Sequence, residues 1–257
     1  MTRIVAFGAG WNSTAMLIGM ADRGIHVDAT LFSDTSAELP HTYRHVERMS
    51  DWCVKHALPQ VTVVRVSGEN IEQNLLRRKA LPSVAYGPKF KTCSQRFKIE
   101  PQEKWCNNWP RAREAWDRGE LIEKCVGFDL DEPQRAKPFR DAKYVNRYPL
   151  IEWEWGLEEC REAIRRAGLP SPGKSSCFFC PNRTASEFRL MREVYPEYIE
   201  RAMALEANAN LTTIKGLKRD HSLKELLANS ELFAFTSGEN CGTCYDGGTE
   251  ACDAFGS

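Results

Sequence analysis

The sequence lacks the features that would assign it to several specialised classes of protein. Its 35 basic and 35 acidic side chains cancel, so whole-chain charge does not predict a nucleic-acid-binding protein, although local basic patches remain open. No apolar run approaches the ~20 residues that a membrane-spanning helix needs, so we expect no membrane partner. There is no low-complexity segment, and the only repeat is a doubled Cys-x-x-Cys. The first residues lead directly into an apolar segment, which leaves no room for a signal peptide and favours the cytoplasm.

What the sequence does contain is an unusual number of cysteines. Ten cysteines in an α/β chain of 257 residues indicate metal, iron–sulfur or redox chemistry more than a disulfide scaffold. Some of them, including Cys53, Cys106 and Cys125, fall in expected helices or strands, and we interpret these as core residues.

Alternating apolar and helix-like segments predict an α/β fold with a doubly wound, mostly parallel sheet. Strands are expected at 4–7, 27–32 and 61–66, separated by helices at 12–22 and 41–56. This order is typical of Rossmann-like folds. Further along the chain we expect helices at 69–80, 105–119, 157–167 and 184–208, a strand at 125–128 and an extended segment at 148–151.

A glycine-containing turn follows the first expected strand. Gly8 and Gly10 let a ligand approach the main chain, and Asn12, Ser13 and Thr14 are typical helix-start residues. A helix N-terminus offers free N–H groups and the positive end of the helix dipole. The pattern therefore predicts a phosphate-binding loop, although glycine turns also occur without a ligand.

Polar residues follow the second expected strand as well. Asp34 and Glu38 lie directly after it, and ligands of open parallel sheets bind at the carboxyl ends of the strands. Both side chains are therefore expected to face whatever the glycine turn holds.

Two segments place cysteines in settings that favour chemistry. Lys89, Lys91, Arg96 and Lys98 surround Cys93, and nearby cations lower the pKa of a thiol, which suits a nucleophile or a metal ligand. By charge counting alone, the favoured interpretation of these four cations is a solvated surface rather than a phosphate site.

A Cys-x-x-Cys motif occurs at Cys177 and Cys180 and is followed by Pro181. Two thiols at this spacing converge on one centre and indicate a metal or iron–sulfur site, with a pair of packing cysteines as the alternative. The loop setting, with Pro170 and Pro172, argues against thioredoxin-like redox use.

Taken together, these motifs resemble the phosphoadenylyl-sulfate reductase family of the PP-loop superfamily, including members encoded by phages. Their order and spacing between about residues 4 and 181 carry the resemblance. The matching segments are 7–15 (phosphate loop), 32–43 (Asp-Thr-Gly…Pro-Glu-Thr-Tyr), 93–101 (Cys-x-x-x-x-Lys-x-x-Pro), 127–135 (Gly-x-x-x-x-Glu-x-x-Arg) and 177–181 (Cys-x-x-Cys).

The resemblance implies a PP-loop nucleotide-binding domain at 1–150 and a helical, cysteine-rich region at 151–257 packed on it. It implies an enzyme that binds ATP or a phosphoadenylyl-sulfate-like nucleotide and works in sulfur transfer or nucleotide modification. Cleavage of ATP between the α- and β-phosphates would adenylate an acceptor, for which a small molecule, tRNA or DNA stays open. The oligomeric state stays open too, with a homo-oligomer among the alternatives.

The same resemblance implies roles for individual residues. The phosphates would contact the backbone and hydroxyl groups of the loop, and Asp34 would help to hold Mg²⁺ as well as act in catalysis. Positive side chains would neutralise the phosphate charge. The implied nucleotide-binding residues are Phe7, Gly8, Gly10, Asn12, Ser13, Thr14 and Asp34, and the implied catalytic residues are Asp34, Arg96, Lys98 and Arg135.

For the cysteines, the resemblance implies a [4Fe–4S] cluster, with structural zinc as the alternative. Cys93, Cys177 and Cys180 supply three ligands. The fourth is Cys160, or alternatively Cys241 or Cys244 from the tail.

Two departures from the family pattern keep other functions open. Asn12 stands where ATP-hydrolysing members have aspartate, so binding is better supported than hydrolysis. The tail motif Cys-Gly-Thr-Cys differs from the redox-active tail of sulfonucleotide reductases. The alternatives are a true sulfonucleotide reductase, and a non-catalytic nucleotide sensor or nucleic-acid-binding module with structural zinc.

Overall fold

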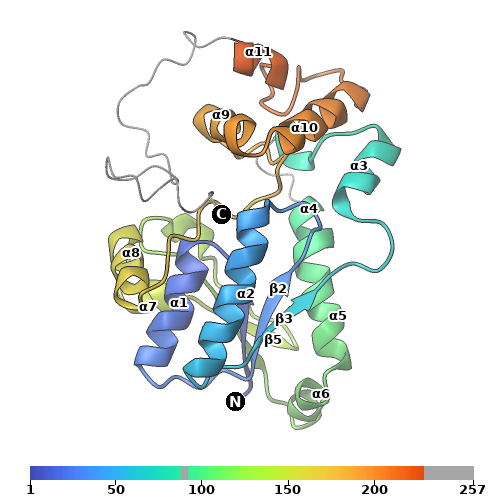
Figure 1. Ribbon diagram of the computed structural model, residues 1–257. Helices are drawn as coiled ribbons and strands as arrows, with labels where there is room; N and C mark the ends of the chain where they lie inside the picture. Colours follow the sequence, from blue (N-terminus) through green and yellow to red (C-terminus); the bar gives the residue numbers. More distant parts are fainter. Residues whose placement is uncertain (88–91, 229–257) are drawn as a thin grey trace. The chain divides into compact units, whose positions relative to one another are not determined.

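The computed structural model describes residues 1–87 and 92–228, which belong to two compact units (Figure 1). The sheet unit comprises Met1–Ser33, Pro40–Arg65 and Glu100–Ser175. The helical unit comprises Asp34–Leu39, Val66–Ile99 and the chain from Ser176 onward. The chain passes between the units several times. The expected domain boundary at residue 150 stays a prediction.

The sheet unit contains a five-stranded parallel sheet in the order β3-β2-β1-β4-β5. This confirms the predicted α/β fold with a doubly wound sheet. In the central strand, Ala6 is paired with Leu31 of β2 on one side and with Val126 of β4 on the other. The strands are β1 (Arg3–Phe7), β2 (Ala29–Ser33), β3 (Val61–Val64), β4 (Ile122–Val126) and β5 (Tyr144–Arg147).

Helices cover both faces of the sheet because alternate residues of each strand point to opposite sides. Val5 and Phe7 of β1 pack with α1 (Trp11–Asp22), α2 (Pro40–Lys55) and α8 (Leu157–Arg166). Ile4 lies in the other core, with Cys106 of α5 (Glu100–Asn108) and Ala112 of α6 (Pro110–Asp117). Figure 1 shows the two helix layers on either side of the strands.

Two expected elements of the sheet unit differ in the structure. The helix expected at 105–119 is divided into α5 and α6, and Pro110 begins the second helix, where a missing backbone N–H costs nothing. The segment 148–151, expected to be extended, instead contains the helical turn α7 (Pro149–Glu152). The extended segment lies earlier, in β5, because Pro149 favours the first position of a helix.

The helical unit is built around an aromatic core. Phe178, Phe179 and Phe188 are fully buried there, and the Phe178 and Phe179 rings meet edge to face with centroids 4.6 Å apart. The described helices are α3 (Ile71–Arg78), η1 (Ser83–Tyr86), α4 (Thr92–Ser94), the π-helical segment η2 (Gln95–Ile99), α9 (Ala185–Val194), α10 (Pro196–Asn208) and α11 (Leu223–Ala228). The cysteine-rich tail with Cys241 and Cys244 lies outside the described residues.

Candidate functional site

The loop between β1 and α1 contains one left-handed residue, which is Ala9 and not one of the two glycines that the sequence singled out. Ala9 adopts φ = 57°, a left-handed conformation that is uncommon for a residue with a side chain, and Gly10 is the N-cap of α1. The Ser13 hydroxyl accepts from Gly10 N–H (3.3 Å) and donates to Gly10 C=O (3.2 Å). The hydroxyl of Ser13 therefore closes the loop onto Gly10. The predicted contact of this helix start with phosphate stays a prediction.

Gly127, the residue after β4, packs directly against this helix start. A Cβ atom at Gly127 would lie 2.9 Å from the backbone nitrogen of Ser13 and 3.0 Å from the carbonyl carbon of Asn12. The strand order explains this contact. β1 and β4 are neighbours, but β1 connects to β2 toward one edge of the sheet and β4 connects to β5 toward the opposite edge. Ligands of open α/β sheets bind at such a point.

Asn12 is held by a residue from the β4 loop. Its side-chain amide donates to Asp129 Oδ2 (2.8 Å), and Asp129 Oδ1 accepts from the backbone N–H of Glu132 (3.1 Å). Asp129 is buried, which raises the pKa of its carboxyl group, while the Asn12 hydrogen bond opposes that rise. The loop thus carries a carboxylate beside position 12, although residue 12 itself is an amide.

Thr14 and Phe7 lie in the core and have no exposed side-chain surface at the loop. Thr14 is fully buried, with its hydroxyl 2.9 Å from His45 Nε2, and the Phe7 ring is 6.3 Å from the His45 ring. Burial, followed by the charges of Arg48 and His41, lowers the pKa of His45 to about 4. His45 is therefore a neutral partner for Thr14 near neutral pH, and the predicted contact of Thr14 with phosphate stays a prediction.

Residues just before the first Cys-x-x-Cys motif contact the β1–α1 loop. Ser175 donates a hydrogen bond to Gly8 C=O, and its Cβ would be 3.8 Å from one added to Gly10. His41 Nε2 lies 3.2 Å from Lys174 C=O, which fixes the neighbouring backbone. We missed Ser175 from the sequence because serine in a Pro-rich stretch carries no signal beyond a turn.

The predicted charged residues of the nucleotide site occupy different settings. Arg135 pairs with Glu132 and lies 4.4 Å over the Phe128 ring, on the loop that begins with Gly127. Asp34 follows β2 directly, is buried, and accepts from Ser36 N–H (2.7 Å). Asp34 belongs to the helical unit, so its predicted role at the phosphates stays a prediction.

The helical unit brings three of the predicted cysteine ligands together. Cys93 and Cys177 each lie near enough to Cys180 for their charges to influence one another. Thr35 Oγ1 is 3.3 Å from Cys177 Sγ, and the backbone N–H of Asn182 donates to the Cys180 sulfur. Hydrogen bonds to sulfur stabilise a thiolate, so these donors fit a thiolate centre chemically.

Charged side chains surround these thiols. Burial, followed by the charge of Glu38, raises the pKa of Cys177 to about 12, and Lys98 opposes this rise. Lys98 Nζ is 3.5 Å from Glu38 Oε1. Partial desolvation lowers the pKa of Lys98, but Glu38 and the neighbouring sulfurs outweigh it, so the net shift is upward. Arg96 is exposed, with its guanidinium 5.3 Å from the centre of the Phe97 ring.

The other described cysteines are buried in the sheet unit. Cys160 is in α8, in the core shared with α1, where burial raises the pKa of its thiol to about 12. Its predicted role as fourth ligand stays a prediction. Cys53, Cys106 and Cys125 are buried, which confirms their interpretation as core residues.

The described part of the chain contains no complete set of metal ligands. Within residues 1–87 and 92–228, no group of three or more His, Cys, Asp or Glu side chains is arranged to hold a metal ion. The predicted roles of Cys93, Cys177 and Cys180 as metal ligands therefore stay predictions.

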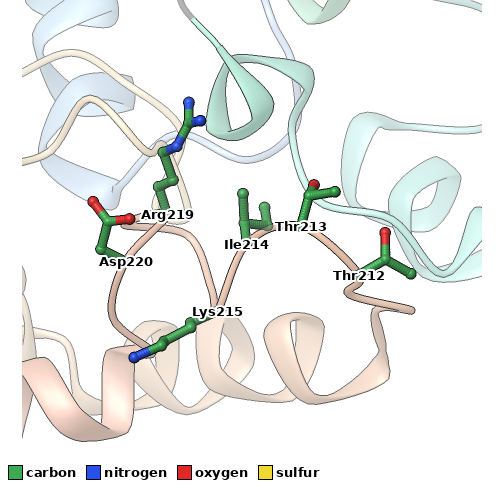
Figure 2. Close-up of a pocket in the computed structure, with 6 residues that line it drawn as sticks. All are labelled: Thr212, Thr213, Ile214, Lys215, Arg219 and Asp220. Atoms are coloured by element: carbon green, nitrogen blue, oxygen red, sulfur yellow. The ribbon is translucent and has the colours of Figure 1, made fainter.

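A hollow of about 330 Å³ opens in the loop between α10 and α11 (Figure 2). Thr212, Thr213, Ile214, Lys215, Arg219 and Asp220 line it, and none of them is a predicted site residue. Among the described helices, none is long and apolar enough to cross a membrane.

Comparison of the chain with protein-family models gives no match, and comparison with curated proteins gives none either.

Proposed function

We propose that the chain binds an adenine nucleotide with its phosphates against the loop between β1 and α1. The observation that carries the proposal is the contact of Gly127 with the start of α1, which puts the β4 loop and the helix N-terminus at one point of the parallel sheet. The backbone N–H groups and the positive dipole end of a helix N-terminus suit a phosphate. The adenine preference and the sulfur-transfer class rest on the resemblance to phosphoadenylyl-sulfate reductase-like proteins.

The chemistry that fits this nucleotide is adenylation. An acceptor oxygen would attack the α-phosphorus of ATP, the bond to the β-phosphate oxygen would break, and pyrophosphate would leave. Arg135, on the loop beside the helix start, would offset phosphate charge. The Asn12–Asp129 pair favours binding over rapid hydrolysis, because the residue at position 12 carries no charge of its own.

A charge-reversal pair of variants tests the nucleotide site. Gly10→Asp adds a good N-cap, so α1 keeps its stability, but its carboxylate repels phosphate. Gly10→Asn is the matched neutral control. In calorimetric titrations with ATP, AMP and phosphoadenylyl sulfate, we expect Gly10→Asp to weaken binding at least about tenfold and Gly10→Asn to change it much less.

Three outcomes of these titrations separate the alternatives. Absence of binding to all three nucleotides by the unmodified chain would refute the proposal, as would equal affinities for the two variants. Binding of ATP without any pyrophosphate release favours a nucleotide sensor. Release of sulfite from phosphoadenylyl sulfate with a thiol reductant favours a true sulfonucleotide reductase.

We further propose that Cys93, Cys177 and Cys180 form a thiolate centre for a [4Fe–4S] cluster, or alternatively zinc. The observation in its favour is the Thr35 and Asn182 contacts to the two sulfurs of the Cys-x-x-Cys motif. When bound, a cluster would supply a site for sulfur or electron transfer.

Anaerobic purification with iron and zinc analysis tests the centre. We expect Cys177→Ala and Cys180→Ala to lose the metal, whereas Cys106→Ala, in the core of the sheet unit, retains it. Cys160→Ala and Cys241→Ala then identify the fourth ligand. Stoichiometric zinc without iron would refute the cluster and leave the zinc alternative, and metal-free wild-type protein would refute both.

A further inference from the structure

Two cationic side chains hold the backbone of the turn that carries Cys177 and Cys180. Arg183 Nε donates to Cys177 C=O (3.1 Å), and one of its terminal nitrogens donates to Ser176 C=O (2.7 Å). Lys218 Nζ donates to Pro181 C=O (3.0 Å) and Arg183 C=O (2.8 Å). The two cations therefore fix the carbonyl groups on both sides of the Cys-x-x-Cys motif.

Arg183 is an unusual residue to find in this position, because only 2% of it is exposed. Burial lowers the pKa of its guanidinium, and the nearby carboxylate of Glu187 opposes this. A buried cation is costly unless its donors are used. Here the donors meet carbonyl oxygens of the cysteine turn, so the turn and the guanidinium satisfy each other.

Lys218 reaches the turn from a loop whose shape is set by a buried carboxylate. Glu206 Oε2 accepts from Leu217 N–H (2.7 Å) and Glu206 Oε1 from Leu223 N–H (2.8 Å), on either side of the loop. Gly216 makes room for this carboxylate, since a Cβ there would lie 2.3 Å from Glu206 Oε2. Figure 2 shows the same loop, in which Lys215 and Arg219 point in different directions.

We propose that Arg183 and Lys218 are positioning residues for the thiolate centre, and that they hold the backbone of the turn with Cys177 and Cys180 in one conformation. The inference rests on the proposed thiolate centre. Removing a residue that supports metal ligands weakens metal binding by about 10- to 100-fold.

Lys218→Met is the main test because Lys218 is only half-buried and Met has a side chain of similar length. Lys215→Met, in the same loop and exposed, is the matched control. Each full-length variant is titrated anaerobically with Co²⁺, and the thiolate-to-cobalt charge-transfer absorbance reports on sulfur ligation. We expect Lys218→Met to bind Co²⁺ about tenfold or more weakly, Lys215→Met to match wild type, and Lys218→Arg to recover most of the affinity. Equal affinities for the two methionine variants would overturn the proposal.

A second measurement needs no metal and so separates this inference from the thiolate centre itself. Hydrogen–deuterium exchange of the amides at 177–183 in the metal-free chain reports on the turn alone. We expect Lys218→Met and Arg183→Lys to speed this exchange at least about tenfold while α9 and α10 keep their protection. Unchanged exchange would overturn the positioning role even if the variants bind metal poorly. If wild type shows no cobalt–thiolate band but the exchange responds, the thiolate centre fails and the positioning of the turn stands.

Discussion

The β1–α1 loop of the sheet unit and the cysteine turn of the helical unit are both short motifs, but they are held in different ways. The loop is held by close backbone packing against Gly127, by the Asn12–Asp129 pair, and by short hydroxyl side chains, Ser13 and Ser175, that bond to its backbone. The turn is held by the buried guanidinium of Arg183 and by Lys218. The loop therefore depends on the absence of a side chain at Gly127 and on short polar side chains, whereas the turn depends on the presence of two long cationic ones.

This difference predicts opposite sensitivities. Added volume at the loop displaces backbone, which cannot move aside cheaply in a packed interior. At the turn, loss of a hydrogen-bond donor leaves carbonyl groups unsatisfied without changing the packing much. Variants of the β1–α1 loop should therefore alter nucleotide binding and stability while the metal content of the cysteine centre stays constant.

The largest effect is expected for Gly127→Ala. Its Cβ would meet the backbone of Ser13 and Asn12 at 2.9–3.0 Å, so the start of α1 must shift. We expect a loss of about 3 kcal/mol in the free energy of unfolding of the sheet unit and at least tenfold weaker ATP binding, from urea unfolding and calorimetry.

Gly8→Ala is the control for this variant, because its Cβ would lie at an ordinary 3.7 Å from Ser13 Oγ. Gly8→Ala should lower the free energy of unfolding of the sheet unit by less than about 1 kcal/mol. If both alanines cost the same, close packing does not hold the loop.

The next effect is a pH dependence from His45. The folded chain holds the pKa of His45 at about 4, compared with 6.5 in the unfolded chain, so only the unfolded chain takes up a proton between these values. The contribution of neutral His45 to the free energy of unfolding is therefore present above about pH 6.5 and is lost as the pH falls toward 4. Between about pH 7 and pH 5 this loss is about 2 kcal/mol in the free energy of unfolding.

His45→Gln should remove that slope, because Gln does not titrate and its amide still reaches the Thr14 hydroxyl. His26→Gln, at an exposed position, should leave the slope in place. An unchanged slope in His45→Gln would assign the acid sensitivity to other groups.

A smaller effect is expected for Asn12→Asp. The new carboxylate would face Asp129 at the 2.8 Å now spanned by a hydrogen bond, so a donor is lost and two like charges meet. We expect a loss of about 1–2 kcal/mol in the free energy of unfolding near neutral pH.

The double variant Asn12→Asp with Asp129→Asn exchanges the two groups and should recover most of the stability. Recovery by the double variant assigns the loss to this pair. A double variant as unstable as the single one would place the cause elsewhere.

Much of the sheet could be predicted from the sequence because its signals are local. The apolar run at β1, the glycines after it and the helix-start residues of α1 lie within 20 residues of one another. The residues that complete each site could not be predicted in this way. Asp129 is 117 positions from Asn12, and Lys218 is 35 positions beyond Arg183. Neither has a neighbour in sequence that indicates its partner, and only the folded chain brings them together.

The smallest effect concerns Arg135, whose ion pair with Glu132 lies at the surface, with 50% and 40% of the side chains exposed. Such a pair contributes under about 1 kcal/mol to stability, so Glu132→Gln should hardly change unfolding. If Arg135 serves the phosphates, the same variant frees its guanidinium and should strengthen ATP binding about two- to fivefold, while Arg135→Gln weakens it. Glu162→Gln, which breaks the comparable pair with Arg165 on α8, is the control and should leave ATP affinity unchanged. Equal ATP affinities for Glu132→Gln, Arg135→Gln and Glu162→Gln would remove Arg135 from the nucleotide site and leave phosphate binding to the backbone of the β1–α1 loop.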